Sequence, residues 1–182
     1  MADPEAPYSF RHDPAGGGAL ADIGSHALAT AEFLLGPIAS VFGHCQTLIP
    51  KRRDSAGNLH DITVDDTTQS IVKFASGVSG SIEANWCANG RTMQHDFEVY
   101  GSKGALLFSQ ERFNELHFFS DSDAKDRRGF RRIEAGPDHF PYGEFCVAPG
   151  HQIGFNDLKA IEIAGLAKAI GGAAPEPFNF RA

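Results

Sequence analysis

Short β-forming segments separated by tight turns fill the middle of this 182-residue chain, and they constrain its fold more than any other feature. The clearest pair, Thr67–Ala75 and Val78–Cys87, flanks Ser76-Gly77, a dipeptide typical of β-hairpin turns. Further strands are predicted at 38–49, 95–100, 105–109, 115–120 and 130–133, with a polar loop at 51–66. Because short turns connect antiparallel neighbours, the pattern predicts an antiparallel sheet.

A helical pattern precedes the strands and another follows them. The first is expected from Asp13, which can cap it, to a glycine-proline stop at Gly36. The second is expected to begin at Asn156 as its cap and to end at Ile170. Apolar residues at helical spacing predict the core-facing stripes, namely Leu20, Ile23, Ala27, Ala31 and Leu34, then Ala160, Ile163, Leu166, Ala167 and Ile170.

The order helix, strands, helix predicts an α+β fold, with an open, mainly antiparallel β-sheet and helices on one face. Hydrophobic residues make up 42% of the chain, enough for a sizeable core, so we expect a single domain over residues 1–182. The other face of the sheet must be polar or covered by a partner. Its apolar residues favour a homo-oligomer formed through that face.

Charge and composition exclude several classes of protein. The net charge of -7 argues against nucleic-acid binding, and the densest cationic run, Lys51–Arg53, is interpreted as solvated surface. No apolar stretch is long enough to span a membrane, and the N-terminus does not resemble a signal peptide. Three widely spaced cysteines, Cys45, Cys87 and Cys146, indicate reduced, partly buried thiols and a cytoplasmic protein.

Motifs that would bind a dinucleotide, a nucleotide phosphate or a metal are absent from the sequence. It contains no G-x-G-x-x-G after a strand, no P-loop, no G-x-S-x-G elbow and no H-E-x-x-H helix. The eight histidines show none of the spacings typical of zinc ligands, so no metal site is expected.

Asp22 and His26 lie four residues apart in the first predicted helix, after the glycines 16–18. With Ala29 and Phe33 they form a second stripe, roughly opposite the core stripe. A solvated helix face rarely carries Phe beside an acid and a histidine, so we expect this stripe to face a cleft or another domain. A histidine held by a carboxylate can donate or accept a proton near neutral pH. A surface ion pair that contributes little is the alternative reading.

Three stretches of the chain resemble a known family. They are "GGGALADIGSHALATAEFLLG", "HDFEVYGSKGALLFSQERFNELHFF" and "PYGEFCVAPGHQIGFNDLKAIEIAGLAKAI". Together they are similar to the dihydrodipicolinate-reductase-like C-terminal domain of the Gfo/Idh/MocA oxidoreductases, and the third reads closest to inositol dehydrogenase-like members. The resemblance implies a partner Rossmann domain, outside this chain, that binds NAD or NADP, with a sugar or polyol bound between the two domains.

The resemblance also implies roles for particular residues. In the family, the histidine matching His26 takes the hydroxyl proton while hydride passes to the nicotinamide, and the acid matching Asp22 positions substrate and histidine. The family's E-K-P lysine motif is absent here, and Ala29 stands where many relatives carry an acid. We therefore expect this chain alone to bind no cofactor and to lack dehydrogenase activity.

Four further residues are candidates for substrate binding. Arg11 precedes the glycine run, although an arginine that anchors the loop is an equal alternative. Trp86 and Arg91 flank a strand-end loop that approaches the substrate in the family, whereas a core tryptophan and a solvated arginine are the plainer interpretations. His151, before the last helix, lines the pocket by resemblance.

These observations favour the substrate-binding and oligomerisation domain of an NAD(P)-dependent oxidoreductase that acts on a sugar or cyclic polyol. A stand-alone, non-catalytic dimerisation or ligand-binding module is the alternative, and a metal-dependent sugar isomerase or lyase is a third hypothesis. The end of the chain at 178–182 is expected to be a cut, because relatives continue into a last helix.

Overall fold

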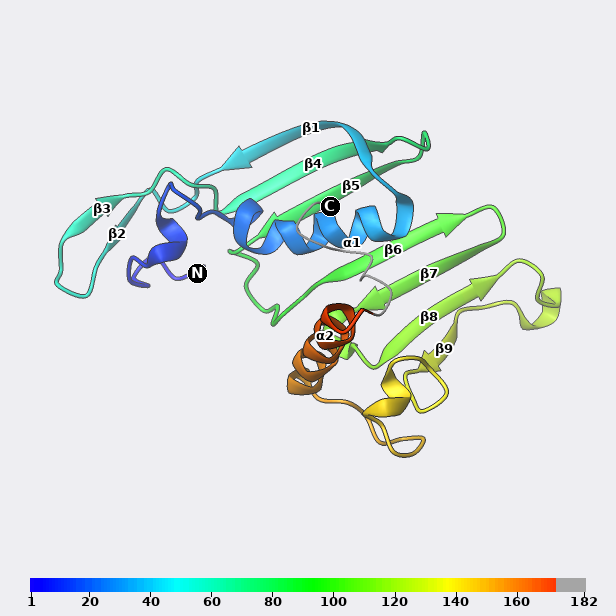
Figure 1. Cartoon of the computed structure of the whole chain (residues 1–182). Helices are drawn as coiled ribbons and strands as arrows, with labels where there is room; N and C mark the ends of the chain where they lie inside the picture. Colours follow the sequence, from blue (N-terminus) through cyan, green and yellow to red (C-terminus); the bar gives the residue numbers. More distant parts are fainter. Residues whose placement is uncertain (173–182) are drawn as a thin grey trace. The chain divides into compact units, whose positions relative to one another are not determined.

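The structure is a computed structural model that describes residues 1–172, so the chain end at 178–182 lies outside the described residues. The chain packs as two compact units, Met1–Arg91 and a second unit from Thr92 onward (Figure 1). All strand pairs are antiparallel, in sheets of order β1-β4-β5, β2-β3 and β6-β7-β8-β9. Antiparallel sheets with few helices confirm the predicted α+β class, although the strands form three sheets rather than one.

The three-stranded sheet of the first unit has one buried and one open face. Its strands are β1 (Ile38–Gln46), β4 (Thr67–Phe74) and β5 (Ser79–Asn85). Val72 and Phe74 are buried on the inner face, against which the helix α1 (Ser25–Leu35) and the turn before it pack. On the outer face Phe42 pairs with Ile71, and these side chains are 79% and 62% exposed. From Gln69 to Phe74 the side chains of β4 alternate between the open and the covered face, as expected of a strand.

The segment predicted as a polar loop at 51–66 instead forms a hairpin of β2 (Lys51–Arg53) and β3 (Leu59–Asp61). Arg52, interpreted from the sequence as solvated, is only 1% exposed. Its guanidinium donates to the backbone carbonyls of Met1, Asp3 and Ala6 at 2.6, 2.9 and 3.0 Å. The prediction was wrong because these three carbonyls, which are distant in sequence, replace the water that an arginine normally requires.

The first helix does not begin at Asp13. A 3₁₀ turn, η1 (Phe10–His12), comes first, then the π-helical turn η2 (Leu20–Gly24), and only then α1. The side chain of Asp13 accepts the N–H of Ala15 at 2.8 Å and so closes a tight turn instead of capping a helix. The predicted stop is confirmed: Gly36, at φ 83°, donates to the carbonyl of Glu32.

The second unit is a four-stranded meander followed by a helix. Its strands are β6 (Asp96–Gly101), β7 (Gly104–Ser109), β8 (Glu115–Ser120) and β9 (Arg131–Glu134), close to the predicted ranges, with 3₁₀ turns η3 (Gln110–Arg112), η4 (Lys125–Arg127) and η5 (Tyr142–Glu144). Asn114 anchors the approach to the helix α2 (Phe155–Ile170), because its side-chain amide exchanges two hydrogen bonds with the backbone of Ile153.

Two details of α2 differ from prediction. Gly154, not Asn156, is the cap, and the carboxylate of Asp157 accepts its N–H at 2.6 Å. The residues expected to face inward are all exposed: Ala160, Ile163, Leu166, Ala167 and Ile170. The half-buried apolar side chains are instead Leu158, Ile161, Ala164 and Ala169. Because α2 carries apolar residues on two faces, helical periodicity alone could not choose between them.

Candidate functional site

Gly18 and Asp65 fix where the helix with the candidate acid and histidine begins. Gly18 has φ 107°, and a Cβ there would collide with Oδ1 of Asp65. The other carboxylate oxygen accepts the N–H of Leu20 at 2.9 Å and the hydroxyl of Thr68 at 2.7 Å. The carbonyl of Asp65 accepts the N–H of Ala19 at 2.8 Å. Gly18 is therefore required, because Asp65, which caps the helix from just before β4, lies too close to this position for a side chain.

Asp22 lies on the π-helical turn, and its partner is Arg11 rather than His26. Oδ2 of Asp22 accepts Nε–H of Arg11 at 2.9 Å, and the Arg11 guanidinium lies 4.6 Å from the centre of the Phe10 ring. Asp22 and His26 form no hydrogen bond or ion pair with each other. A π turn changes the angle between successive residues, so a four-residue spacing does not stack side chains as it does in an α-helix.

His26 nevertheless belongs to an exposed face of α1. His26, Ala29 and Phe33 are all exposed, with Phe33 at 61%, whereas Ala27, Ala31 and Leu34 are half-buried. The side chain of Asp22 is 32% exposed. We name Asp22, His26, Ala29 and Phe33 the exposed stripe. The imidazole of His26 can be reached from outside the unit, and the carboxylate of Asp22 is hydrogen-bonded at one oxygen only.

The other three candidates are spread over the chain. Trp86 is half-buried directly after β5, with its ring edge-on to His12 at 6.0 Å between centroids. Arg91 is exposed at the end of the first unit. His151 is exposed in the second unit, where its backbone carbonyl accepts the thiol of Cys146. Among the six candidates the structure joins Arg11 to Asp22.

Sequence reasoning missed a group of buried polar side chains in the first unit. His12 and Arg52 are each 1% exposed, and Asp66 is 0% exposed. Oδ2 of Asp66 accepts the N–H groups of Leu48 and Ile49 at 2.8 and 2.9 Å. We name His12, Arg52 and Asp66 the buried polar cluster. The acidic doublet 65–66 directly before a strand is the one signal that could have revealed part of it.

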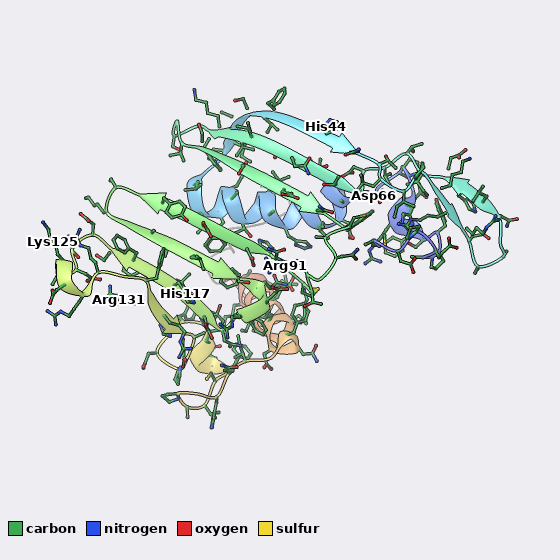
Figure 2. The ribbon with its side chains drawn as sticks, turned by 180° about the vertical axis from the view of Figure 1, so that it is seen from behind. His44, Asp66, Arg91, His117, Lys125 and Arg131 are labelled. Carbon is green, nitrogen blue, oxygen red and sulfur yellow. The ribbon has the colours of Figure 1, made fainter. Side chains whose placement is uncertain are left out.

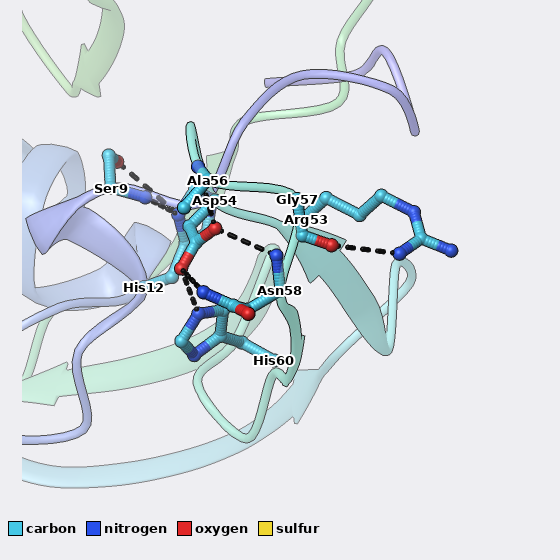
Figure 3. Close-up of polar contacts among 8 residues, drawn as sticks. All are labelled: Ser9, His12, Arg53, Asp54, Ala56, Gly57, Asn58 and His60. Atoms are coloured by element: carbon cyan, nitrogen blue, oxygen red, sulfur yellow. Dashed lines mark hydrogen bonds and ion pairs between the residues drawn. The ribbon is translucent and has the colours of Figure 1, made fainter.

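His12 is held by its neighbours as a neutral imidazole. Its Nδ1 accepts the backbone N–H of Ser9 at 3.0 Å (Figure 3). Burial, and then the positive charge of Arg52, lowers the pKa of His12 below its ordinary value of 6.5. Burial and the charge of Asp66 raise the pKa of the Cys87 thiol in the same region. These four side chains therefore lie within electrostatic range of one another.

The β2–β3 hairpin carries a second histidine. Nε2 of His60 lies 2.9 Å from Oδ2 of Asp54 (Figure 3). The His60 ring stacks on Tyr8 at 4.4 Å between centroids. The hydrogen bond from His60, followed by those from Asn58, holds the pKa of Asp54 well below its usual range. The stacking of Tyr8 on His60 attaches the N-terminal segment to the hairpin.

Within residues 1–172 no group of three or more His, Cys, Asp or Glu side chains could hold a metal ion. A hollow of about 100 Å³, lined by Pro4, Glu5, Lys51, Arg52, Arg53 and Leu59, contains none of the six candidates. In the same described part, helices long and apolar enough to cross a bilayer are absent.

The glycine run does not fit a nicotinamide dinucleotide. It follows a 3₁₀ turn rather than a strand, and Gly18 closes against the carboxylate of Asp65. In a dinucleotide site the corresponding glycines leave room for a pyrophosphate at the N-terminus of a helix, and a carboxylate there would repel it. This glycine run therefore provides no cradle for a dinucleotide.

Comparison with known proteins gives a consistent result. The sequence model of the GFO/IDH/MocA C-terminal domain matches residues 1–107. The chain is 37% identical over 195 residues to levoglucosan dehydrogenase of Pseudarthrobacter phenanthrenivorans, covering 97% of this chain and 50% of that protein. It is 31% identical over 107 residues to an uncharacterised oxidoreductase of Synechocystis, covering 57% of this chain and 29% of that protein.

Solved structures agree with the sequence matches. An NAD binding oxidoreductase from Klebsiella pneumoniae superposes with a TM-score of 0.92 at 37% identity, over 99% of this chain and 49% of that one. Levoglucosan dehydrogenase in complex with NADH and levoglucosan superposes with a TM-score of 0.90 at 38% identity, over 97% and 48%. The chain thus spans about half the length of these relatives. It belongs to the GFO/IDH/MocA C-terminal domain family.

Proposed function

We propose that this chain is the substrate-binding and oligomerisation domain of an NAD(P)-dependent oxidoreductase that oxidises a CH–OH group of a sugar or cyclic polyol, and that it is inactive alone. The observation that carries the proposal is the similarity, over nearly the whole chain, to a levoglucosan dehydrogenase whose structure holds NADH and levoglucosan. Levoglucosan and L-sorbose, which that relative's structures contain, are therefore the first substrates to test.

In this proposal His26 is the proton acceptor. Its imidazole lies on the exposed stripe and makes no hydrogen bond within the described residues, so a substrate hydroxyl can reach it. The neutral ring takes the hydroxyl proton, while the nicotinamide, held by another domain, supplies the redox chemistry.

Asp22 positions the substrate. Arg11 occupies its Oδ2, so Oδ1 is the oxygen that can accept a substrate hydroxyl. Arg11 then acts by orienting Asp22, in addition to any direct contact with substrate. Trp86, Arg91 and His151 remain proposed substrate contacts, through stacking for the indole and hydrogen bonds for the other two.

Reduction of NAD or NADP in the presence of a sugar and polyol panel tests this function. The purified chain alone should give no turnover, and the same chain expressed with its upstream reading frame should reduce the cofactor with at least one sugar. Turnover by the chain alone would overturn the division of labour proposed here. An upstream reading frame without a dinucleotide-binding segment would favour the stand-alone module.

We also propose that a second copy covers the outer face of the β1-β4-β5 sheet. Phe42 and Ile71 form a cross-strand apolar pair on that face. The pair exposes more apolar surface than a single exposed side chain would. Sedimentation should show an oligomer that Phe42→Lys dissociates. Leu59→Lys, at an exposed apolar position on β3, is the matched control and should leave the oligomer intact. A wild-type monomer would refute this part.

The proposed compartment is the cytoplasm. All three cysteines are free thiols in the structure, with Cys45 exposed, Cys87 half-buried and Cys146 buried. An exposed free thiol is more compatible with a reducing compartment than with an oxidising one.

A further inference from the structure

The buried polar cluster leaves three polar atoms without a hydrogen-bond partner in the described part of the chain. They are Nε2 of His12, Nε of Arg52 and Oδ1 of Asp66. Each belongs to a side chain that is at least 99% buried. An unsatisfied buried polar group costs about 1–3 kcal/mol, and more when it is charged, so three in one region require a chemical explanation.

Several contacts bring the three side chains into one region. The ring of Trp86 meets His12 edge-on, and the backbone N–H of the same tryptophan donates to the carbonyl of Asp66 at 2.9 Å. Arg52 and Asp66 both act electrostatically on His12 and on Cys87. Asp66 lies at the start of β4, beside the N-terminal segment (Figure 2).

Arg52 and Asp66 carry opposite charges, yet they form no direct ion pair with each other. The guanidinium uses its two terminal nitrogens on backbone carbonyls, and the carboxylate uses Oδ2 on backbone N–H groups. The atoms left over are therefore one N–H donor and one acceptor. Two buried charges in this arrangement are stabilised when a third group bridges them.

The tautomer of His12 shows whether its unpaired ring nitrogen is a hydrogen-bond donor or an acceptor. Because Nδ1 accepts a backbone N–H, the neutral ring carries its proton on Nε2, which is then a donor. The cluster presents two donors and one acceptor. The Asp66 carboxylate would repel an anion, and the N–H groups of Arg52 and His12 would repel a cation. Water is the small species that accepts two hydrogen bonds and donates one, and buried waters typically make about three.

We propose that His12, Arg52 and Asp66 hold one internal water molecule. The water accepts hydrogen bonds from Nε2 of His12 and Nε of Arg52, and it donates one to Oδ1 of Asp66. It joins η1, β2 and the start of β4, where the neighbouring Asp65 caps the helix of the exposed stripe. The water is thus part of the structure that positions that helix, and its existence does not depend on the proposed function.

Nuclear magnetic resonance of the full ¹⁵N-labelled chain tests the proposal. The Nε2–H proton of His12 should be observable, with Nδ1 unprotonated, and should show a cross-peak to water with the sign of a long-lived bound molecule. His139 is the matched control, because this histidine is exposed in the second unit and its ring proton should exchange too fast to be seen. An observable His12 proton without a water cross-peak would overturn the proposal, as would a proton on Nδ1.

A high-resolution crystal structure of the same chain gives an independent readout. The expected result is one water peak within hydrogen-bond distance of all three atoms. A direct Arg52–Asp66 ion pair, a bound chloride, or three atoms with no density between them would each refute the site. Neither experiment requires a variant, so a substitution that fails to fold cannot obscure the answer.

Discussion

The buried polar cluster and the exposed stripe use the same kinds of side chain in opposite surroundings. His12 and Asp66 are sealed in the first unit, with their hydrogen bonds directed at fixed backbone groups. His26 and Asp22 lie at its surface, where the imidazole is unengaged and the carboxylate is held at one oxygen. The buried polar cluster therefore supports the structure, whereas the exposed stripe has groups that a ligand can reach.

This division predicts opposite consequences of substitution. Changes in the sealed region should alter the free energy of unfolding, because a buried group that loses its partner retains its full desolvation cost. Changes in the exposed stripe should alter turnover with little effect on stability, because water replaces any lost contact.

The largest effect is expected for His26→Ala in the complete oxidoreductase proposed above. Loss of a general base lowers kcat by about 10²–10⁴-fold, whereas the unfolding free energy should change by less than about 0.5 kcal/mol. Steady-state kinetics and urea unfolding measure the two quantities. His139→Ala, which removes an exposed histidine from the second unit, should leave both unchanged. An unaltered kcat in His26→Ala would remove this residue from the mechanism.

Arg52→Met should be the most destabilising change in the sealed region. It leaves three backbone carbonyls without their charged donor, and a hydrogen bond to a charged group contributes about 1.5–3 kcal/mol, so we expect a loss of at least about 3 kcal/mol. Urea unfolding followed by circular dichroism measures the loss. Arg53→Met is the matched control, because Arg53 is exposed on the same strand and should cost less than about 1 kcal/mol. Equal losses in the two variants would contradict the burial of Arg52.

Gly18→Ala connects the two regions, since the glycine lies between them in the chain. The positive φ and the collision with Asp65 should cost about 1–3 kcal/mol of stability. Gly16→Ala is the control, because nothing lies within 4 Å of a Cβ at that position. Thermal unfolding of both variants makes the comparison, and a Gly16→Ala loss as large as that of Gly18→Ala would argue against the cap by Asp65.

The smallest effect concerns pH. The folded-state pKa of His12 lies below 6.5, so the unfolded chain binds a proton more readily than the folded chain. The stability contributed by neutral His12 is therefore complete above about pH 6.5 and falls toward the folded pKa, by at most about 1.4 kcal/mol per pH unit.

Urea unfolding between about pH 7.5 and pH 5.5 measures this slope. Arg52 and the N-terminal ammonium oppose protonation of His12 and Asp66 favours it, and all three charges are included in the lowered pKa. A His12→Gln variant should flatten the slope even if it lowers stability throughout. An identical slope in the variant would assign the pH dependence to other groups.

Elements that depend on near neighbours could be predicted from the amino-acid sequence. Antiparallel hairpins follow from turns such as Ser76-Gly77, where Gly77 has φ 89°, and the helix stop at Gly36 follows from the same backbone freedom. The exposed stripe was also predictable in outline, because helical spacing separated His26 and Phe33 from the half-buried side of α1.

Which polar groups are buried, and with which partners, depends on contacts between segments that are distant in sequence. Arg52 is buried by carbonyls 46 to 51 residues away, and Asp65 caps a helix start 45 residues away. The inward face of α2 and the pairing of Asp22 with Arg11 also depend on tertiary contacts. A local sequence pattern indicates φ preferences and hydrophobic period. The burial of a charge depends instead on which distant backbone groups replace its water, and those groups come together only once the chain has folded.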